Sequence, residues 1–323
     1  MNVPSFRKTF LRLRVARVLR MSAGAFALVV SAVACSQPAA STNAPTTSSD
    51  LQARIAALVE KTRKNLVFVE GGSFEMGDFG VKYGAEKLPY TSATDDDYLH
   101  KVTLDRFSIG AYKVTYAEYD VFSEATGRPK ITTHSREQAL RLPDVPAGVD
   151  WQQARDYCQW IGKQVGLQMD LPTEAQWEYA ARNRGKFVVY PTDNGQIDPG
   201  RNAPTHEQIQ DYRFKHRIER TSTPMQVGLY PPTPIGLFDM VGNGEEWVLD
   251  WYAEDYSRTA PMKNPIGPAK GTKRVWRSYG NVGADTLIHV SMTFARGSGE
   301  PKTEDSKSGI SFNLHSTARC VSK

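Results

Sequence analysis

Cysteine and histidine are scarce in this sequence of 323 residues, and the motifs of several common enzyme classes are missing. There are three cysteines and six histidines, and no two histidines lie four residues apart, the spacing with which a helix presents a histidine pair to a metal. The sequence also lacks a Gly-x-Ser-x-Gly nucleophile elbow and a phosphate-binding loop. These absences argue against a helical metalloenzyme, a serine hydrolase of the elbow type and a nucleotide hydrolase.

Excess charge is missing from most of the chain as well. The formal net charge is +5, but six cations and no carboxylate lie in residues 1–35: Arg7, Lys8, Arg12, Arg14, Arg17 and Arg20. Taking these six charges from the total leaves −1 for residues 36–323. A nearly neutral domain has no electrostatic reason to bind a phosphate backbone, so we expect no nucleic-acid partner.

The basic leader is followed by an apolar run at residues 23–34 and by Cys35, the order of a secretory signal peptide. The run is shorter than the roughly 20 residues that span a bilayer, so we expect residues 1–35 to be a removed signal. Ala32-Val33-Ala34-Cys35 resembles a bacterial lipobox, in which the cysteine is lipidated, and Ser36 after it implies sorting to the outer membrane. The alternative is cleavage near Ala34, which releases an unanchored protein.

Residues 36–64 predict a tether and a lead-in helix. From Ser36 to Asp50 the chain is rich in Ser, Thr, Pro and Ala and has almost no bulky apolar side chain, as in a flexible linker. From Leu51 to Lys64 the apolar residues have helical spacing. We expect this helix to pack on the domain that follows.

The segments after residue 64 have the patterns of β-strands. Gly71-Gly72 interrupts a segment rich in strand-forming residues, 65–78, and this pattern predicts a hairpin. Alternation from Val102 toward Val114 predicts a second pair of strands. Thr115 is a suitable N-cap for a helix after them.

Two helices are expected between residues 149 and 184. The first has an apolar face formed by Trp151, Ala154, Cys158 and Ile161. Thr173 and Gln176 predict a capping box at the start of the second. The apolar stripe of the second consists of Trp177, Ala180 and Ala181.

Residues 236–251 combine apolar side chains with a Gly-Asn-Gly turn, carboxylates and two tryptophans. A turn over Gly242 and Gly244 would direct two backbone carbonyls and the carboxylates of Asp239 and Glu246 toward one point. Calcium prefers such an all-oxygen environment. The alternative is a plain hairpin turn at Asn243-Gly244 with both acids solvated.

The run Gly-Leu-Phe-Asp-Met-Val-Gly-Asn-Gly-Glu-Glu-Trp at 236–247 resembles the hallmark of the formylglycine-generating enzyme family, also called the sulfatase-modifying factor family. Residues 65–78, 100–119 and 154–182 resemble further motifs of that family. The resemblance covers residues 65–323 as one domain. It implies an α+β fold, a variant of the C-type lectin fold, with short strands, two core helices and long loops.

The resemblance also implies metal ligands and a disulfide. The family holds a structural calcium ion at the positions of Asp239, Gly242, Gly244 and Glu246. Asn202 resembles a residue of a second metal site, for which Asp211 is the candidate carboxylate. Cys158 and Cys320 match a disulfide pair of the family.

Active members of the family oxidise a substrate cysteine with a copper ion held by two thiolates, the soft ligands that Cu(I) prefers. In this sequence the thiolate positions fall near Asn281 and Ile288, and neither residue is cysteine. Copper is therefore not expected. The same segment is expected to line the groove of the fold through Ser278, Tyr279, Asn281, Ile288, His289 and Arg296.

These expectations combine in one functional hypothesis. The chain is a lipoprotein facing the periplasm, attached to the outer membrane by lipid on Cys35 alone, whose domain has lost copper and binds a protein partner. An immunity or accessory protein for a secreted toxin is one such role, because loop variation converts an enzyme groove into a recognition surface. The rival hypothesis is a metal-dependent oxidoreductase of the same superfamily that uses another cofactor on a peptide or secondary metabolite.

Overall fold

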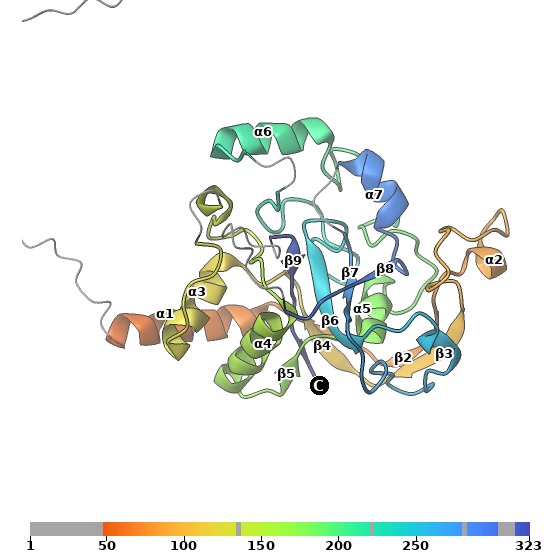
Figure 1. Cartoon of the computed structure of the whole chain (residues 1–323), viewed down its shortest axis with the longest axis horizontal. Helices are drawn as coiled ribbons and strands as arrows, with labels where there is room; N and C mark the ends of the chain where they lie inside the picture. The colour runs from red at the N-terminus through yellow and green to blue at the C-terminus, as the bar shows by residue number, and fades with distance from the viewer. Residues whose placement is uncertain (1–47, 134–136, 220–222, 280–282, 303–313) are drawn as a thin grey trace, which may run out of the picture. The chain divides into compact units, whose positions relative to one another are not determined.

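The computed structural model describes residues 48–133, 137–219, 223–279, 283–302 and 314–323, and Figure 1 shows their arrangement. The helices within these ranges are α1 (Ser48–Lys64), α2 (Gly80–Tyr83), α3 (Tyr116–Thr126), α4 (Trp151–Val165), α5 (Glu174–Ala181), α6 (His206–His216) and α7 (Ala284–Val290). None of them is long and apolar enough to cross a membrane. The expected signal peptide, Cys35 and Asn281 lie outside the described residues.

Short strands form three sheets. The first has the order β1 (Leu66–Val69), β4 (Phe107–Gly110), β10 (Val321–Ser322) and β5 (Met169–Asp170). The second pairs β2 (Gly72–Met76) with β3 (His100–Leu104). The third has the order β8 (Arg296–Gly299), β7 (Arg274–Arg277), β6 (Glu245–Trp251) and β9 (Ser316–Thr317). This mixture of helices and short strands is the expected α+β arrangement.

The hairpin expected at Gly71-Gly72 is wrong, because the glycines form a bend and not a turn. β1 pairs with β4 and β2 pairs with β3 in one continuing register, so the chain on both sides of Gly71 runs along a single bent ribbon. A Cβ on Gly71 would lie 2.6 Å from the carbonyl oxygen of Leu104. Only glycine lets the two bent chains approach so closely. The strands expected from Val102 onward are present, but they pair with β2 and β1.

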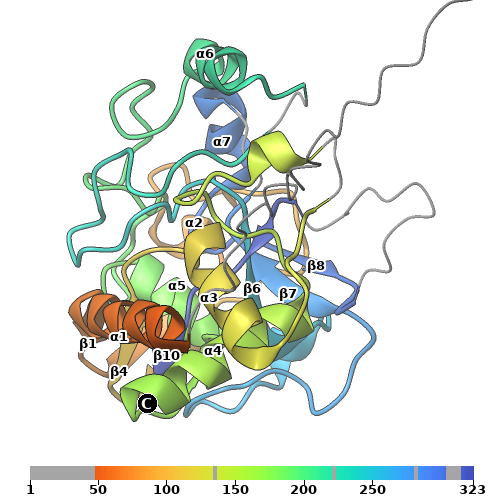
Figure 2. The same cartoon turned by 90° about the vertical axis from the view of Figure 1, so that its left-hand side faces the viewer.

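The lead-in helix is confirmed. α1 begins at Ser48, so it includes the end of the segment expected to be a tether. Leu58 is buried in the core that α3 and α4 share. Arg54 forms an ion pair of 2.7 Å with Glu124 of α3. Figure 2 shows α1 beside α4, and these contacts hold it against the domain.

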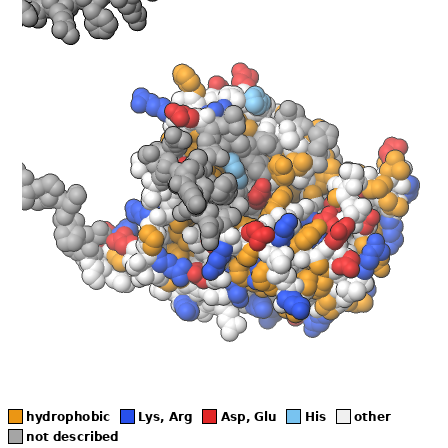
Figure 3. Space-filling view, in the orientation of Figure 1, with side chains coloured by type: hydrophobic (Ala, Val, Ile, Leu, Met, Phe, Trp, Pro, Cys, Tyr) orange, Lys and Arg blue, Asp and Glu red, His pale blue; other side chains and the backbone are white. Residues whose placement is uncertain are grey.

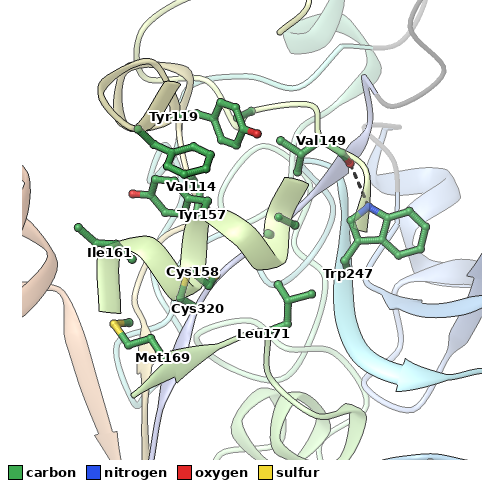
Figure 4. Close-up of a cluster of buried hydrophobic side chains, with 14 of the residues drawn as sticks. Val114, Tyr119, Val149, Tyr157, Cys158, Ile161, Met169, Leu171, Trp247 and Cys320 are labelled. Carbon is green, nitrogen blue, oxygen red and sulfur yellow. Dashed lines mark hydrogen bonds between the residues drawn. A yellow bond between two sulfur atoms is a disulfide. The ribbon is translucent and has the colours of Figure 1, made fainter. Parts of the chain in front are cut away.

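The apolar face of α4 is confirmed as the centre of the core. It buries Trp151, Ala154, Cys158 and Ile161. Figure 4 shows this face between Tyr119 of α3 and Trp247 of β6. The indole of Trp247 donates a hydrogen bond of 3.0 Å to the carbonyl of Val149. The core therefore joins α3, α4 and the third sheet.

The disulfide between Cys158 and Cys320 is present, as the resemblance implied. It joins residues 162 apart in sequence, with Cα atoms 5.4 Å apart. Cys320 directly precedes β10, which lies between β4 and β5 in the first sheet. The bond therefore fixes this last strand to α4, beside the buried side chains that Figure 4 shows.

The predicted helix caps are confirmed. Thr115 forms a capping box with Glu118 at the start of α3, and Thr173 forms one with Gln176 at the start of α5. Every residue of α5 is buried, so the expected apolar stripe covers only part of a helix that is enclosed on all sides. The polar residues of α5 therefore need partners inside the protein.

Sequence reasoning missed three of the described helices, α2, α6 and α7. α6 lies in a segment rich in basic residues, around Arg213. Thr205 and Gln208 form its capping box. The Thr-x-x-Gln spacing that predicted α5 is present here as well. The segment has few apolar residues, so it lacks the helical apolar pattern that supported the prediction of the other helices.

Candidate functional site

The loop before β6 has an unusual backbone. Four of its residues have positive φ, namely Asp239 (55°), Gly242 (70°), Asn243 (57°) and Gly244 (102°). The Asn243 side chain accepts a hydrogen bond of 2.7 Å from the backbone N–H of Met225 and donates one of 3.1 Å to its carbonyl. Asp239 accepts a bond of 2.9 Å from the backbone N–H of Gly228. A second loop therefore holds this one in shape.

Glu246 is the centre of a buried ion cluster at the base of the loop. Its two oxygens accept hydrogen bonds of 2.7 and 2.9 Å from Arg319, and the indole of Trp177 donates another of 2.9 Å. The ammonium group of Lys113 lies 3.2 Å from Oε1. Burial alone would raise the pKa of Glu246, but Arg319 and Lys113 outweigh it and lower the pKa to about 2. The carboxylate is therefore charged at neutral pH.

Lys113 lies where the calcium ion was expected. Its ammonium group donates to the carbonyl of Gly244 and pairs with Glu246, which are two of the four expected ligands. The third expected ligand, the carbonyl of Gly242, accepts a long bond of 3.4 Å from the hydroxyl of Ser278. These residues do not fit a calcium ion. The alternative hairpin with solvated acids is also wrong, because Glu246 is completely buried.

Lys113 and Arg319 face several acidic side chains, and Glu245 interacts with Lys113 as well. Lys113 and Arg319 provide two positive charges, and Asp239 and Glu246 provide two carboxylates that interact with them. In the part of the chain that the structure describes, no group of three or more His, Cys, Asp or Glu side chains could hold a metal ion.

Lys113 was missed in the sequence, although a signal for it was present. Burial alternates along the chain from β4, with Phe107, Ile109 and Ala111 on the buried side. The same alternation places Lys113 inside. A lysine at an inward position is rarely buried without a partner, so the pattern predicts a buried carboxylate opposite it.

Asn202, expected at a second metal site, is buried in a network of its own. Its Oδ1 accepts a hydrogen bond of 2.7 Å from the backbone N–H of Asp198. Its Nδ2 donates to Asp193 at 2.9 Å and to the carbonyl of Gln196 at 3.0 Å. The carboxylate beside Asn202 is therefore Asp193 and not Asp211, which lies in α6. Arg201 binds Asp193 as well, so this carboxylate is already paired.

A second buried ion cluster lies between α5 and the strands β7 and β8. Glu174 binds Arg296 through bonds of 2.8 and 2.7 Å and Arg277 through one of 2.9 Å. Arg277 also pairs with Glu178 at 3.1 Å. The cluster borders a hollow that is partly open to solvent. Further acids of the hollow are Asp95, Asp96 and Asp250.

Two carboxyl groups of this hollow have pKa values raised well above their ordinary range. Burial, and then the neighbouring charge of Glu174, raises the pKa of Asp250 to about 8. Burial raises the pKa of Asp96 to about 7. Asp250 also accepts a hydrogen bond of 2.8 Å from the backbone N–H of Glu174. Since acids outnumber arginines here, the hollow suits a cationic or hydrogen-bond-donating group better than an anion.

The described residues among those expected to line a groove lie in different surroundings. Ser278 is buried, and its hydroxyl donates a hydrogen bond of 3.2 Å to the carbonyl of Met240. The side chain of Arg296 is 6% exposed and belongs to the Glu174 cluster. Ser278 is therefore part of the interior, whereas Arg296 lines the hollow beside Glu174.

The remaining groove residues lie elsewhere. The ring of Tyr279 lies edge-on to that of Trp276, with centroids 6.1 Å apart. Ile288 is exposed on α7, where its carbonyl accepts a hydrogen bond of 2.7 Å from Tyr190. The backbone of His289 is part of α7, and its side chain lies outside the described structure, as does all of Asn281.

The chain is similar to known proteins in sequence. Residues 52–311 match a family described as the sulfatase-modifying factor enzyme 1-like domain. The formylglycine-generating enzyme of Streptomyces coelicolor is 28% identical over 289 residues, which cover 77% of this chain and 88% of that enzyme. The serine/threonine-protein kinase pkn1 of Chlamydia pneumoniae is 31% identical over 231 residues, or 66% of this chain. The aligned part of this chain spans only 32% of the length of that kinase.

The fold is also similar to a solved structure. PvdO from Pseudomonas aeruginosa superposes with a TM-score of 0.60 and 24% identity, over 80% of this chain and 94% of PvdO. This likeness confirms the expected fold. Together with the match over residues 52–311, it shows that this chain belongs to the formylglycine-generating enzyme and sulfatase-modifying factor family.

Proposed function

We propose that this domain is a protein-binding member of its family and not a copper-dependent oxidase. The observation that carries the proposal is a group of exposed apolar side chains around α2, here called the α2 patch: Val81, Tyr83, Leu88 and Phe187. Exposed apolar side chains that gather on one surface are typical of a site that another protein covers. Aromatic residues in particular are enriched in such interfaces.

Aromatic ring contacts hold the α2 patch in place. The rings of Tyr83 and Phe187 stack with centroids 4.0 Å apart. Phe187 also contacts the buried Phe79 below it, at 5.3 Å. Figure 1 shows α2 at the edge of the domain opposite α1, and Figure 3 shows hydrophobic side chains among charged ones on that edge. A preformed aromatic surface loses little conformational entropy when a partner binds.

The cysteines support the loss of copper chemistry. The sequence has three, and Cys158 and Cys320 are joined in the disulfide. Cys35 alone is left, whereas a copper dithiolate needs two thiolates. The positions expected for those thiolates hold Asn281 and Ile288.

The proposed setting is the periplasmic face of the outer membrane, with a lipid on Cys35 as the only attachment. A tethered domain without its ancestral chemistry suits the role of an immunity or accessory protein that blocks a secreted toxin. The partner in this proposal is therefore a protein that enters or crosses the periplasm.

Binding to the proteins encoded beside this gene tests the proposal. Each neighbour is purified and its affinity for the domain is measured by biolayer interferometry. Leu88, which is 65% exposed, is replaced in L88D, and we expect this change to weaken binding at least about tenfold. The matched control is F214D on α6, where the side chain is 89% exposed and binding should not change.

Two results would contradict the proposal. A purified domain that contains stoichiometric copper or iron and consumes oxygen with a thiol peptide would support the rival oxidoreductase. Equal loss of binding in L88D and F214D would remove the α2 patch from the proposal.

A further inference from the structure

We infer that Lys113 is a built-in cation, which supplies the positive charge that a metal ion would otherwise supply to the loop at residues 239–244. Its side chain is 0% exposed and contacts the carbonyl of Gly244 and the carboxylate of Glu246. An ammonium group is a compact point charge with three donors, so it satisfies several oxygens at once. The loop then folds without calcium.

The oxygens that a metal would need are already in use. Oε1 of Glu246 contacts Lys113 and Arg319, and Oε2 contacts Arg319 and Trp177. A divalent ion at this point would have to displace a buried ammonium group or lie against it. Both arrangements are unfavourable, because like charges repel strongly where water is excluded.

The backbone conformation of the loop also depends on the contact between Lys113 and Gly244. Gly244 has a φ of 102°, and a Cβ there would lie 2.6 Å from the side chain of Thr317, so this backbone fits only as glycine. Its carbonyl is held by Lys113, while Asn243 holds the other side of the turn through Met225. Without the ammonium group, the carbonyl of Gly244 loses this donor and Glu246 loses one of its two cations.

The same geometry predicts that removal of the lysine creates a metal site. In K113A the side chain leaves a space bounded by the carbonyl of Gly244 and the carboxylate of Glu246. Both are hard oxygen ligands, and water can complete the coordination of calcium. The methionine variant K113M also removes the charge, but its side chain still fills the space.

The experiment measures thermal unfolding of the full domain with excess calcium and with chelator, and bound calcium by native mass spectrometry. Wild type should unfold at the same Tm in both conditions and carry no calcium. K113M and K113A in chelator should unfold roughly 10 °C lower. Calcium should raise the Tm of K113A by roughly 5 °C or more, and should not raise that of K113M.

A surface lysine provides the control. Lys61 pairs with Glu118 in a half-exposed ion pair, so K61A should keep the wild-type Tm and show no calcium response. Calcium bound to wild type, or a fall of its Tm in chelator, would overturn the inference. A K113A protein that calcium does not stabilise would also overturn the inference. The same holds for a K113A protein that does not fold in calcium while K113R folds.

Discussion

Single buried charges organise this domain, and each is matched to partners from distant parts of the chain. Arg319 shows this most clearly, because its guanidinium binds Glu246 and the carbonyls of Gly110, Ala111 and Phe238. A fully buried ion pair that keeps all its donors occupied is costly to break from one side. Stability at this scale therefore depends on complete sets of partners.

Replacement of Arg319 should be strongly destabilising. R319M leaves Glu246 with Lys113 as its only cation, and we expect a loss of about 3–5 kcal/mol in the free energy of unfolding. The control R201M removes an arginine whose side chain is 43% exposed, and should cost less than about 1 kcal/mol. Urea denaturation measures both. Equal effects would mean that the Glu246 cluster contributes no more than a surface pair.

Asp250 should make stability fall as the pH rises. Its pKa is raised to about 8, above the ordinary 3.8, so between these values the folded protein holds a proton that the unfolded chain has lost. The free energy of unfolding therefore decreases through that window, with a slope of at most about 1.4 kcal/mol per pH unit from this group.

D250N mimics the protonated carboxyl and should remove that slope. Its amide oxygen can still accept the bond from the backbone of Glu174. In urea denaturation from pH 5 to pH 9, the stability advantage of D250N over wild type should grow with pH up to about pH 8 and then level off. Parallel curves throughout would contradict a raised pKa for Asp250.

At the scale of elements, α4 and the C-terminal strand depend on each other. β10 consists of two residues and forms few hydrogen bonds, yet it lies inside a sheet and not at its edge. The adjacent disulfide holds it there.

Removal of that disulfide should destabilise the domain substantially. A closed loop of 162 residues corresponds to about 5 kcal/mol in the chain-entropy model. The double variant C158A/C320A should therefore show a much lower urea midpoint than wild type under oxidising conditions. With reductant the two proteins should become similar. Alkylation of both cysteines in the native oxidised protein would contradict the bridge.

Element prediction from the sequence succeeded for α1, α3, α4 and α5, missed α2, α6 and α7, and failed for strand pairing. Capping boxes at Thr115 and Thr173 are local signals, because the cap and its partner lie three residues apart. The pairing of β1 with β4 is not local. Gly71 looked like a turn because a glycine pair carries the same local signal in a turn and in a bent strand.

At the scale of the whole molecule, we predict export and lipidation at Cys35. The basic and apolar leader with small residues before the cysteine motivates this prediction. Mass spectrometry of the mature protein from a membrane fraction should find an acylated N-terminal Cys35. An unacylated N-terminus near Cys35 in the soluble periplasmic fraction would support the alternative, cleavage without an anchor.

The sequence by itself determined the family, the fold class, the main helices and the disulfide. These rest on motifs and periodic patterns that are complete within short segments or carried by the resemblance. The sequence also indicated that Asp239, Gly242, Gly244 and Glu246 are directed toward one point.

Only the tertiary structure decided which cation that cluster holds. Lys113 lies 131 residues before Gly244 and Arg319 lies 73 residues after Glu246, so neither contact has a local sequence signature. A carboxylate in an all-oxygen loop is equally suited to a metal ion or an ammonium group. The choice follows from which side chain the fold delivers to the loop, and here the segment after β4, in which burial still alternates, places a lysine there.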